Sequence, residues 1–212
     1  MGLGRLFSFA SSLTCLLFVT FPLTGVASPT TIDFEGLTDG TLITTQYSGL
    51  TFSNAQILTA GLSLNEFELP PHSGVNVVSD YTGPLTIVFA TPVSSVSGYF
   101  TYDEALTLTA YDSSANVLGS VASAFSNNLA LSGLAGSSPN ELLQLSFSSG
   151  ISELVIAGDP NGGSFALDDL TYSTGGVTNP TPEPGTMGLA AACFSLCVLV
   201  WRINTQARRN RS

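Results

Sequence analysis

Acid–base chemistry in this sequence must come from carboxylates and a single histidine. Residues 28–173 contain fourteen Asp or Glu residues and His72, but no Lys, Arg or Cys. A Cys–His nucleophile, a cysteine-based zinc site and a Walker phosphate loop are therefore excluded from this stretch. The G-x-S-x-G spacing of a serine nucleophile is also missing. What remains is the chemistry of paired carboxylates.

Glu66 and Glu68 form the most suggestive carboxylate pair, because alternate residues of a strand project from the same face. Two such acids about 5–10 Å apart would suit glycoside hydrolysis. The prolines at 70–71 instead place the pair in a loop, and fourteen acids in a short body bring some pair together by chance. We expect His72, in the same loop, to be solvated rather than catalytic. The sequence therefore predicts a protein that is not an enzyme.

A third candidate is the segment Asp159-x-Asn161-x-Gly163, which has the spacing of the first half of an EF-hand calcium loop. The twelfth position of such a loop is a bidentate glutamate, but here it is Leu170. Glycine, asparagine and proline are also the residues of tight turns. We therefore predict a hairpin turn at residues 159–163 rather than an EF-hand.

Charge is distributed very unevenly along the 212 residues. The formal net charge is −10, yet all five arginines lie in the first five or the last eleven positions, which leaves residues 28–173 at −14. Phosphate binding requires a basic face, so a nucleic-acid partner is excluded. A mean hydropathy of +0.36 excludes generic disorder, which needs low hydrophobicity and high charge. We predict a folded acidic body between two ends of different character.

Residues 1–27 have the organisation of a secretory signal peptide. Arg5 precedes an uncharged apolar stretch, residues 6–21, and the small residues Gly25-Val26-Ala27 follow. A short basic region, an apolar region and a small-residue cleavage site are the three parts of such a peptide. We predict that the protein is exported and that the peptide is cleaved after Ala27.

The C-terminal end combines a linker, an apolar stretch and a basic tail. Residues 174–184 are rich in Gly, Pro and Thr, a composition that indicates an extended linker. Residues 185–201 carry no charge and as a helix would reach roughly 25 Å, the short end of a membrane span. Residues 202–212 contain four arginines, which the positive-inside rule places in the cytoplasm. We predict a transmembrane helix that leaves the body outside the cytoplasmic membrane.

This C-terminal arrangement resembles the PEP-CTERM sorting signal of bacterial envelope proteins. The matching residues are the triplet Pro182-Glu183-Pro184, the apolar stretch 185–201 and the arginine-rich tail. The resemblance implies recognition by an exosortase, a membrane enzyme similar to cysteine proteases, with cleavage near the triplet. It also implies a bacterium that makes exopolysaccharide or biofilm. The protein would be anchored at the cytoplasmic membrane before processing and would then reach the cell surface, outer envelope or extracellular matrix. The alternative is a permanent single-span anchor.

The central body, residues 28–173, shows hydrophobic alternation with a period of two. Apolar side chains alternate with polar or small ones in four segments: residues 85–89, 96–101, 106–110 and 143–147. Such alternation indicates strands with one buried and one solvated face, and turn residues separate them. We predict an all-β fold of roughly nine to eleven strands, an antiparallel β-sandwich or jelly roll. Residues 139–141 could start a single helical turn.

Two segments of the body resemble a pattern of extracellular jelly-roll domains, including many PEP-CTERM proteins and some carbohydrate-binding modules. One is the opening Ile32-Asp33-Phe34-Glu35-Gly36-Leu37, and the other is the closing Phe165-Ala166-Leu167-Asp168-Asp169-Leu170. The resemblance implies that the first and last strands run side by side and that carboxylates of both hold a structural calcium ion. The residues expected to bind this ion are Glu35, Asp168 and Asp169. Calcium prefers about six to eight oxygen ligands, which carboxylates and backbone carbonyls supply.

The combined features predict an exported, non-enzymatic β-sandwich protein of the cell envelope or biofilm matrix. An alternative is an extracellular carbohydrate-binding module that captures exopolysaccharide. Carbohydrate platforms use exposed aromatic faces, and the body has no Trp. The aromatic groups available for such a platform are Tyr47, Tyr81, Tyr99, Tyr102 and Tyr111. A secreted hydrolase is a third hypothesis.

Overall fold

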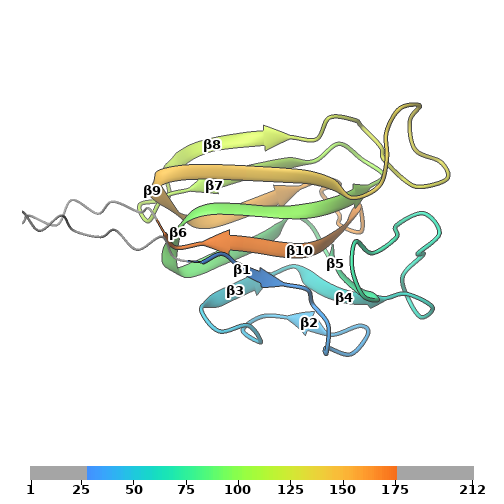
Figure 1. The fold of residues 1–212 in the computed structure, drawn as a ribbon, viewed down its shortest axis with the longest axis horizontal. Coiled ribbons are helices and arrows are strands. Elements are labelled where there is room, and N and C mark those ends of the chain that lie inside the picture. Colours follow the sequence, from blue (N-terminus) through green and yellow to red (C-terminus); the bar gives the residue numbers. More distant parts are fainter. Residues whose placement is uncertain (1–27, 176–212) are drawn as a thin grey trace, which may run out of the picture.

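Ten β-strands make up the part of the chain that the computed structural model describes, residues 28–175 (Figure 1). Their bounds are β1 Thr30–Ile32, β2 Leu42–Ile43, β3 Leu50–Ser53, β4 Ala55–Thr59, β5 Asn76–Asp80, β6 Leu85–Tyr102, β7 Thr107–Tyr111, β8 Val117–Ala122, β9 Glu141–Ala157 and β10 Phe165–Ser173. The predicted all-β class and the strand number are confirmed. Within residues 28–175 no helix is long and apolar enough to cross a membrane. The predicted signal peptide, PEP triplet, C-terminal helix and basic tail lie outside the described residues.

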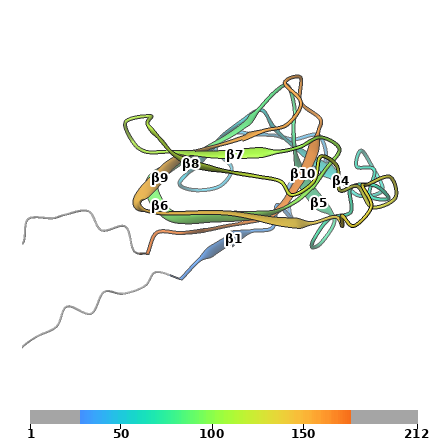
Figure 2. The same ribbon diagram turned by 90° about the horizontal axis from the view of Figure 1, so that it is seen from above.

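All strand pairs are antiparallel and join into one sheet with the order β2-β4-β5-β10-β6-β9-β7-β8, while β1 adds to β10 and β3 adds to β6. Strands β6 and β9 each contribute to two different parts of this sheet. The first part of β6 pairs with β3 up to Phe89 and with the end of β9 up to Val88. Its last part, from Ser95, pairs with β10 and with the start of β9. The register shifts between Val88 and Ser95, where the sheet folds over into two layers (Figure 2).

One hydrophobic core fills the space between the two layers. Leu85, Ile87 and Phe89 of β6 are at most 4% exposed, whereas the alternate residue Val88 is 40% exposed. Phe100, at 0%, continues the buried series in the second half of the strand. The same continuous cluster includes residues from β1 through β10. Residues 28–175 therefore contain a complete core, as an independently folding domain requires.

The predicted pairing of the first and last strands is confirmed. Thr30 lies opposite Tyr172 and Ile32 lies opposite Leu170. Strand β5 pairs with the other half of β10, at Ala166 and Leu167. The two neighbours of β10 on this side therefore meet end to end.

The predicted helical turn at 139–141 is wrong. Asn140 has a left-handed backbone with φ of 60°, and β9 begins directly after it. Asn128, which is fully buried, anchors the preceding loop. Its side-chain amide accepts a hydrogen bond from the backbone N–H of Tyr102 (2.7 Å) and donates to the carbonyl of Phe100 (3.0 Å). These bonds tie the loop to the end of β6, so the loop polar groups are satisfied without a helix.

Candidate functional site

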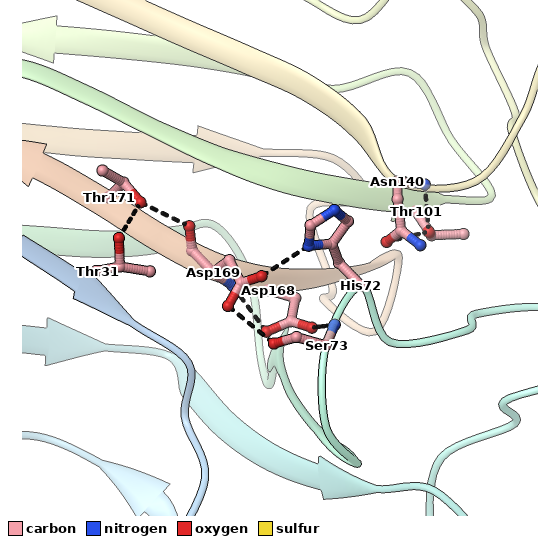
Figure 3. Close-up of polar contacts among 8 residues, drawn as sticks. All are labelled: Thr31, His72, Ser73, Thr101, Asn140, Asp168, Asp169 and Thr171. Atoms are coloured by element: carbon pink, nitrogen blue, oxygen red, sulfur yellow. Dashed lines mark hydrogen bonds and ion pairs between the residues drawn. The ribbon is translucent and has the colours of Figure 1, made fainter.

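A β-bulge in β10 lies at the junction between its two neighbours, β5 and β1. The register with β6 shifts between Asp168 and Thr171, and Asp169 has a left-handed backbone with φ of 48°. An extra residue of this kind changes the direction of the side chains beside it. Here the bulge brings the carboxylates of Asp168 and Asp169 against the loop that precedes β5 (Figure 3).

Both aspartates accept hydrogen bonds from residues 72–73 of that loop. Asp168 Oδ2 accepts the backbone N–H of Ser73 (2.7 Å), and its Oδ1 accepts the N–H of Asp169 (2.7 Å). Asp169 Oδ1 accepts the hydroxyl of Ser73 (2.9 Å), and its Oδ2 lies 2.6 Å from Nδ1 of His72. The two neighbouring carboxylates thus each have their own donors in the loop.

Glu35 holds the next part of the same loop. Its Oε1 accepts the backbone N–H groups of Val75 (2.7 Å) and Asn76 (2.8 Å). Gly74 has φ of 54°, and a Cβ there would lie 2.2 Å from Glu35 Oε1. Only glycine therefore allows the carboxylate to approach this backbone so closely. We call Glu35, Asp168 and Asp169 together the carboxylate clasp.

The clasp contains the three residues that the sequence assigned to calcium. The structure brings all of them to residues 72–76, where each is bonded to loop donors. Within residues 28–175 no three His, Cys, Asp or Glu side chains converge closely enough to form a metal site. A carboxylate oxygen has more than one lone pair, so these hydrogen bonds do not use the full capacity of the clasp. Calcium binding here stays a prediction.

Asp168 is the buried member of the clasp, at 1% exposed. Burial raises the pKa of its carboxyl to about 6, although the N–H groups of Ser73 and Asp169 act in the opposite direction. A charged carboxylate loses hydration when it is buried, and two hydrogen bonds replace only part of that hydration. The loop at residues 72–76, which buries Asp168 and donates to it, therefore shifts the pH range in which this carboxyl loses its proton to about 6.

His72 is exposed, as predicted, but its ring is held by two neighbours. Its side chain is 35% exposed, and its ring stacks on Tyr99 of β6 with centroids 3.5 Å apart and planes within 7°. Nδ1 contacts Asp169, which fixes the ring in place over the sheet. Tyr99 does lie on the face opposite Val96 and Phe100, as the alternation predicted. The stack of His72 on Tyr99 forms because the loop before β5 lies over β6, and the periodicity of the sequence does not predict this contact.

A row of uncharged polar side chains extends from this stack along the outer face of β1, β10, β6 and β9. Residues opposite each other on antiparallel strands project from the same face. Ser97 lies opposite both Thr171 and Gln144, and Ser95 lies opposite both Ser173 and Ser146. We call this set the polar face, and it consists of Thr31, Ser95, Ser97, Gln144, Ser146, Thr171 and Ser173. Figure 3 shows Thr31 bonded to Thr171, with Oγ1 atoms 2.7 Å apart.

The remaining predicted acids have structural partners in loops. Glu66 Oε2 accepts the N–H of Gly61 (3.2 Å), and Glu68 Oε2 accepts those of Leu131 (3.0 Å) and Ser132 (3.1 Å). The bond from Leu131 is the main reason that the pKa of Glu68 is lowered. The predicted loop position of both acids is confirmed. Glu68 fastens the loop 61–70 to the loop 123–140.

The segment 159–163 forms a turn, in which Asp159 Oδ1 accepts the N–H of Asn161 (2.7 Å). The predicted hairpin is wrong, because the turn joins β9 to β10 and these strands are separated by β6 in the sheet. Sequence reasoning missed the neighbouring Asp80, which is 1% exposed at the end of β5. Its carboxylate accepts the N–H (2.9 Å) and hydroxyl (2.9 Å) of Ser164, and burial raises its pKa. The only signal for this role is the position of Asp80 directly before a turn.

Of the five tyrosines proposed as a platform, two are packed inside. Tyr102 is fully buried, and burial raises the pKa of its phenol to about 12. Tyr47 packs edge-on against Phe34 with centroids 5.8 Å apart, and burial likewise raises its pKa to about 12. Tyr81 is 50% exposed. Tyr111 of β7 lies opposite Glu153 of β9, away from the polar face. Tyr99 of β6, two residues from Ser97, lies next to the polar face.

No known sequence family matches the chain, and no curated protein matches it. Among solved structures, the K2 cleaved adhesin domain of Lys-gingipain is 16% identical, with a TM-score of 0.44 over 68% of this chain and 99% of that one. A family 29 carbohydrate-binding module complexed with cellulohexaose is 12% identical, with a TM-score of 0.40 over 71% and 93%. A family 6 carbohydrate-binding module is 10% identical, with a TM-score of 0.35 over 63% and 92%. At these scores the matches do not establish a family or a function.

Proposed function

We propose that this chain is an exported, non-enzymatic β-sandwich protein of the bacterial cell envelope or biofilm matrix. A signal peptide at 1–27 exports it, and a PEP-CTERM signal that contains Pro182-Glu183-Pro184 directs its sorting. The helix 185–201 holds the protein at the cytoplasmic membrane until an exosortase-type enzyme cleaves near the triplet. The acidic body then remains at the cell surface, in the outer envelope or in the matrix.

The pairing of β1 with β10 is the observation that best supports this proposal. Thr30 lies opposite Tyr172, so the body begins and ends at the same end of the sandwich (Figure 1). The loops 61–75 and 123–140 lie at the other end. A tether that continues from Tyr172 would therefore attach the body by one end and leave these loops facing outward. This arrangement suits a displayed domain.

The candidate catalytic groups have structural partners, which supports a non-enzymatic role. Glu66 and Glu68 hold loop backbone, and Nδ1 of His72 contacts Asp169. The fourteen carboxylates of residues 28–173, with no Lys or Arg among them, keep copies of the body soluble and mutually repelling at low salt. Such a body suits a cation-rich extracellular matrix.

The sorting proposal is tested by the location of two variants in the producing bacterium. Wild-type protein should be found in the outer envelope or matrix fraction. Glu183→Ala, which removes the carboxylate of the triplet, should accumulate in the cytoplasmic membrane fraction. Thr181→Ala is the matched control in the same linker and should behave as wild type. The same distribution for all three proteins would contradict recognition of the triplet.

The polar face favours a second candidate function, the binding of exopolysaccharide. Its hydroxyl and amide groups can both donate and accept hydrogen bonds, as sugar hydroxyls require. The stacked His72 and Tyr99 lie at one end of the face and offer aromatic surface beside it. Because the face itself is uncharged and the body is acidic, a neutral polysaccharide suits it better than an anionic one.

A glycan array tests this candidate with residues 28–175, in calcium and in chelator. We expect binding to neutral glycans that Gln144→Ala weakens. Thr109→Ala, on strand β7 of the other layer, is the control and should bind as wild type. Failure of all neutral glycans to bind, or equal loss in both variants, would contradict the polar face as a sugar site.

A further inference from the structure

Two loops at one end of the sandwich carry the most exposed apolar side chains of residues 28–175 (Figure 1). Leu62 and Phe67 lie in the loop 61–75, and Leu131 lies in the loop 123–140. Their exposed fractions are 73%, 71% and 76%, whereas no other large apolar side chain of the described residues exceeds 62%. Single exposed apolar groups are ordinary, but a cluster of them marks a contact surface. We call these three residues the apolar tip.

Two carboxylates link the residues of the apolar tip. Glu66 Oε2 accepts the backbone N–H of Gly61 (3.2 Å), the residue before Leu62. Glu68 Oε2 accepts the backbone N–H of Leu131 (3.0 Å), so the second loop is fastened to the first. The third member of the tip stands between the two glutamates in the sequence. The exposed apolar side chains and the two carboxylates therefore belong to one small surface.

The carboxylates beside the apolar tip can still bind a cation of a partner. The hydrogen bond from Leu131 is the main reason that the pKa of Glu68 is lowered, so this carboxyl is ionised at neutral pH. A carboxylate oxygen accepts more than one hydrogen bond, which leaves Glu66 and Glu68 free to accept a further donor. Residues 28–173 contain no Lys or Arg that could supply it. The surface thus combines apolar groups with negative charge that no Lys or Arg of the body neutralises.

This charge decides which partner suits the apolar tip. A second copy would bring fourteen further carboxylates and no Lys or Arg from its own residues 28–173, so like charges oppose it. A lipid bilayer would draw Glu66 and Glu68 toward its apolar interior, where a carboxylate loses its hydration. A chain that carries Lys or Arg beside apolar side chains complements both parts of the surface.

We propose that the apolar tip binds a cationic amphipathic peptide segment, whose apolar side chains cover the tip and whose Lys or Arg groups pair with Glu66 and Glu68. The inference does not depend on sugar binding or on the sorting signal. It assigns a contact surface to residues that belong neither to the polar face nor to the carboxylate clasp.

A synthetic peptide of Leu and Lys, with Leu at the spacing of one helix face, is the probe. Isothermal titration calorimetry at physiological salt measures its binding to residues 28–175. We expect saturable binding of one peptide per protein. A lysine-only peptide of the same charge lacks the apolar contacts and should bind about tenfold more weakly or less. A peptide of Leu and Glu in the same pattern should not bind, because its charge has the wrong sign.

Substitutions at the apolar tip show whether the peptide binds there. Phe67→Ser and Leu131→Ser should each weaken binding about tenfold, as loss of one buried apolar side chain does. Val117→Ser is the matched control, because Val117 is also exposed but lies at the start of β8, away from both loops (Figure 1). Glu66→Gln should weaken binding about threefold, whereas Glu153→Gln on β9 changes the net charge equally and should bind as wild type. Thermal unfolding shows that each variant is folded.

Several results would overturn the proposal. One is a wild-type protein that does not bind the Leu/Lys peptide. Equal binding of the lysine-only peptide, or equal weakening by Glu153→Gln, would mean that net charge alone holds the peptide. Equal weakening by Val117→Ser would place the contact elsewhere on the body. Sedimentation with phosphatidylcholine vesicles that Phe67→Ser abolishes, in a protein that does not bind the peptide, would assign the apolar tip to a lipid surface instead.

Discussion

Replacing Asp168 by asparagine should change how the stability of the body depends on pH. The ordinary pKa of this carboxyl is 3.8, and burial raises it to about 6 in the folded state. The folded state therefore holds the proton more tightly than the unfolded state. The resulting stabilisation is complete below about pH 3.8 and is lost as the pH rises through about 6. A shift of about two units corresponds to about 3 kcal/mol.

Asp168→Asn has no proton to lose, so the stability difference between wild type and variant should vary by about 2–2.5 kcal/mol between pH 4 and pH 7. Near pH 4 the folded wild type carries the protonated acid, which like the amide has one carbonyl oxygen, so the variant should be about as stable as wild type. By pH 7 the variant should be more stable than wild type by about 2 kcal/mol.

Denaturant unfolding of residues 28–175 at pH 4, 5, 6 and 7 measures this difference. Asp112→Asn is the control, because hydrogen bonds from Asn116 lower the pKa of the exposed Asp112. That carboxylate stabilises the fold above its ordinary pKa, and its contribution is lost as the pH falls. Because this loss occurs below about pH 3.8, the Asp112 difference should stay nearly constant from pH 4 to 7. A stability difference for Asp168→Asn that stays constant from pH 4 to 7 would refute the raised pKa of the buried Asp168 carboxyl.

Three further predictions address the loop, the metal and the core. Gly74→Ala should cost about 3 kcal/mol of unfolding free energy, because the added Cβ would collide with Glu35. Gly40→Ala, where φ is 77° and the Cβ would meet open space, should cost about 1 kcal/mol. Equal losses in urea unfolding would contradict the close contact at Gly74. Calcium at 100 times its dissociation constant should add about 2.7 kcal/mol of stability over chelator, and identical thermal midpoints would exclude a structural calcium ion. Phe100→Ala should cost about 3–5 kcal/mol and Phe67→Ala, at an exposed position, less than about 0.5 kcal/mol; a similar loss in both would contradict the core.

The strand pattern of the body was predictable because burial on one face imposes a period of two. Leu85, Ile87 and Phe89 show this pattern in the sequence and are buried in the structure. The fold of the sheet into two layers was not predictable in detail. It depends on register shifts between Val88 and Ser95, which leave no distinct sequence signal.

The candidate site was predictable only in part. Glu35, Asp168 and Asp169 stand out as carboxylates near the first and last strands, and these strands do pair. Their partners were not predictable, because backbone N–H groups occur at nearly every residue and Ser73 is 95 positions away from Asp168. The stack of His72 on Tyr99 likewise arises from the position of a loop over a strand. Contacts of this kind become visible only in three dimensions.

Intact-mass measurement of the protein from the envelope or matrix of the producing bacterium tests the central proposal most directly. Export and sorting predict a mature chain that begins at Ser28 and lacks residues 185–212. The measured mass locates both cleavage sites in a single experiment. A chain that retains residues 1–27 would contradict export through a cleaved signal peptide. A chain that retains residues 185–212 would contradict processing at the PEP-CTERM signal and would leave a permanent anchor.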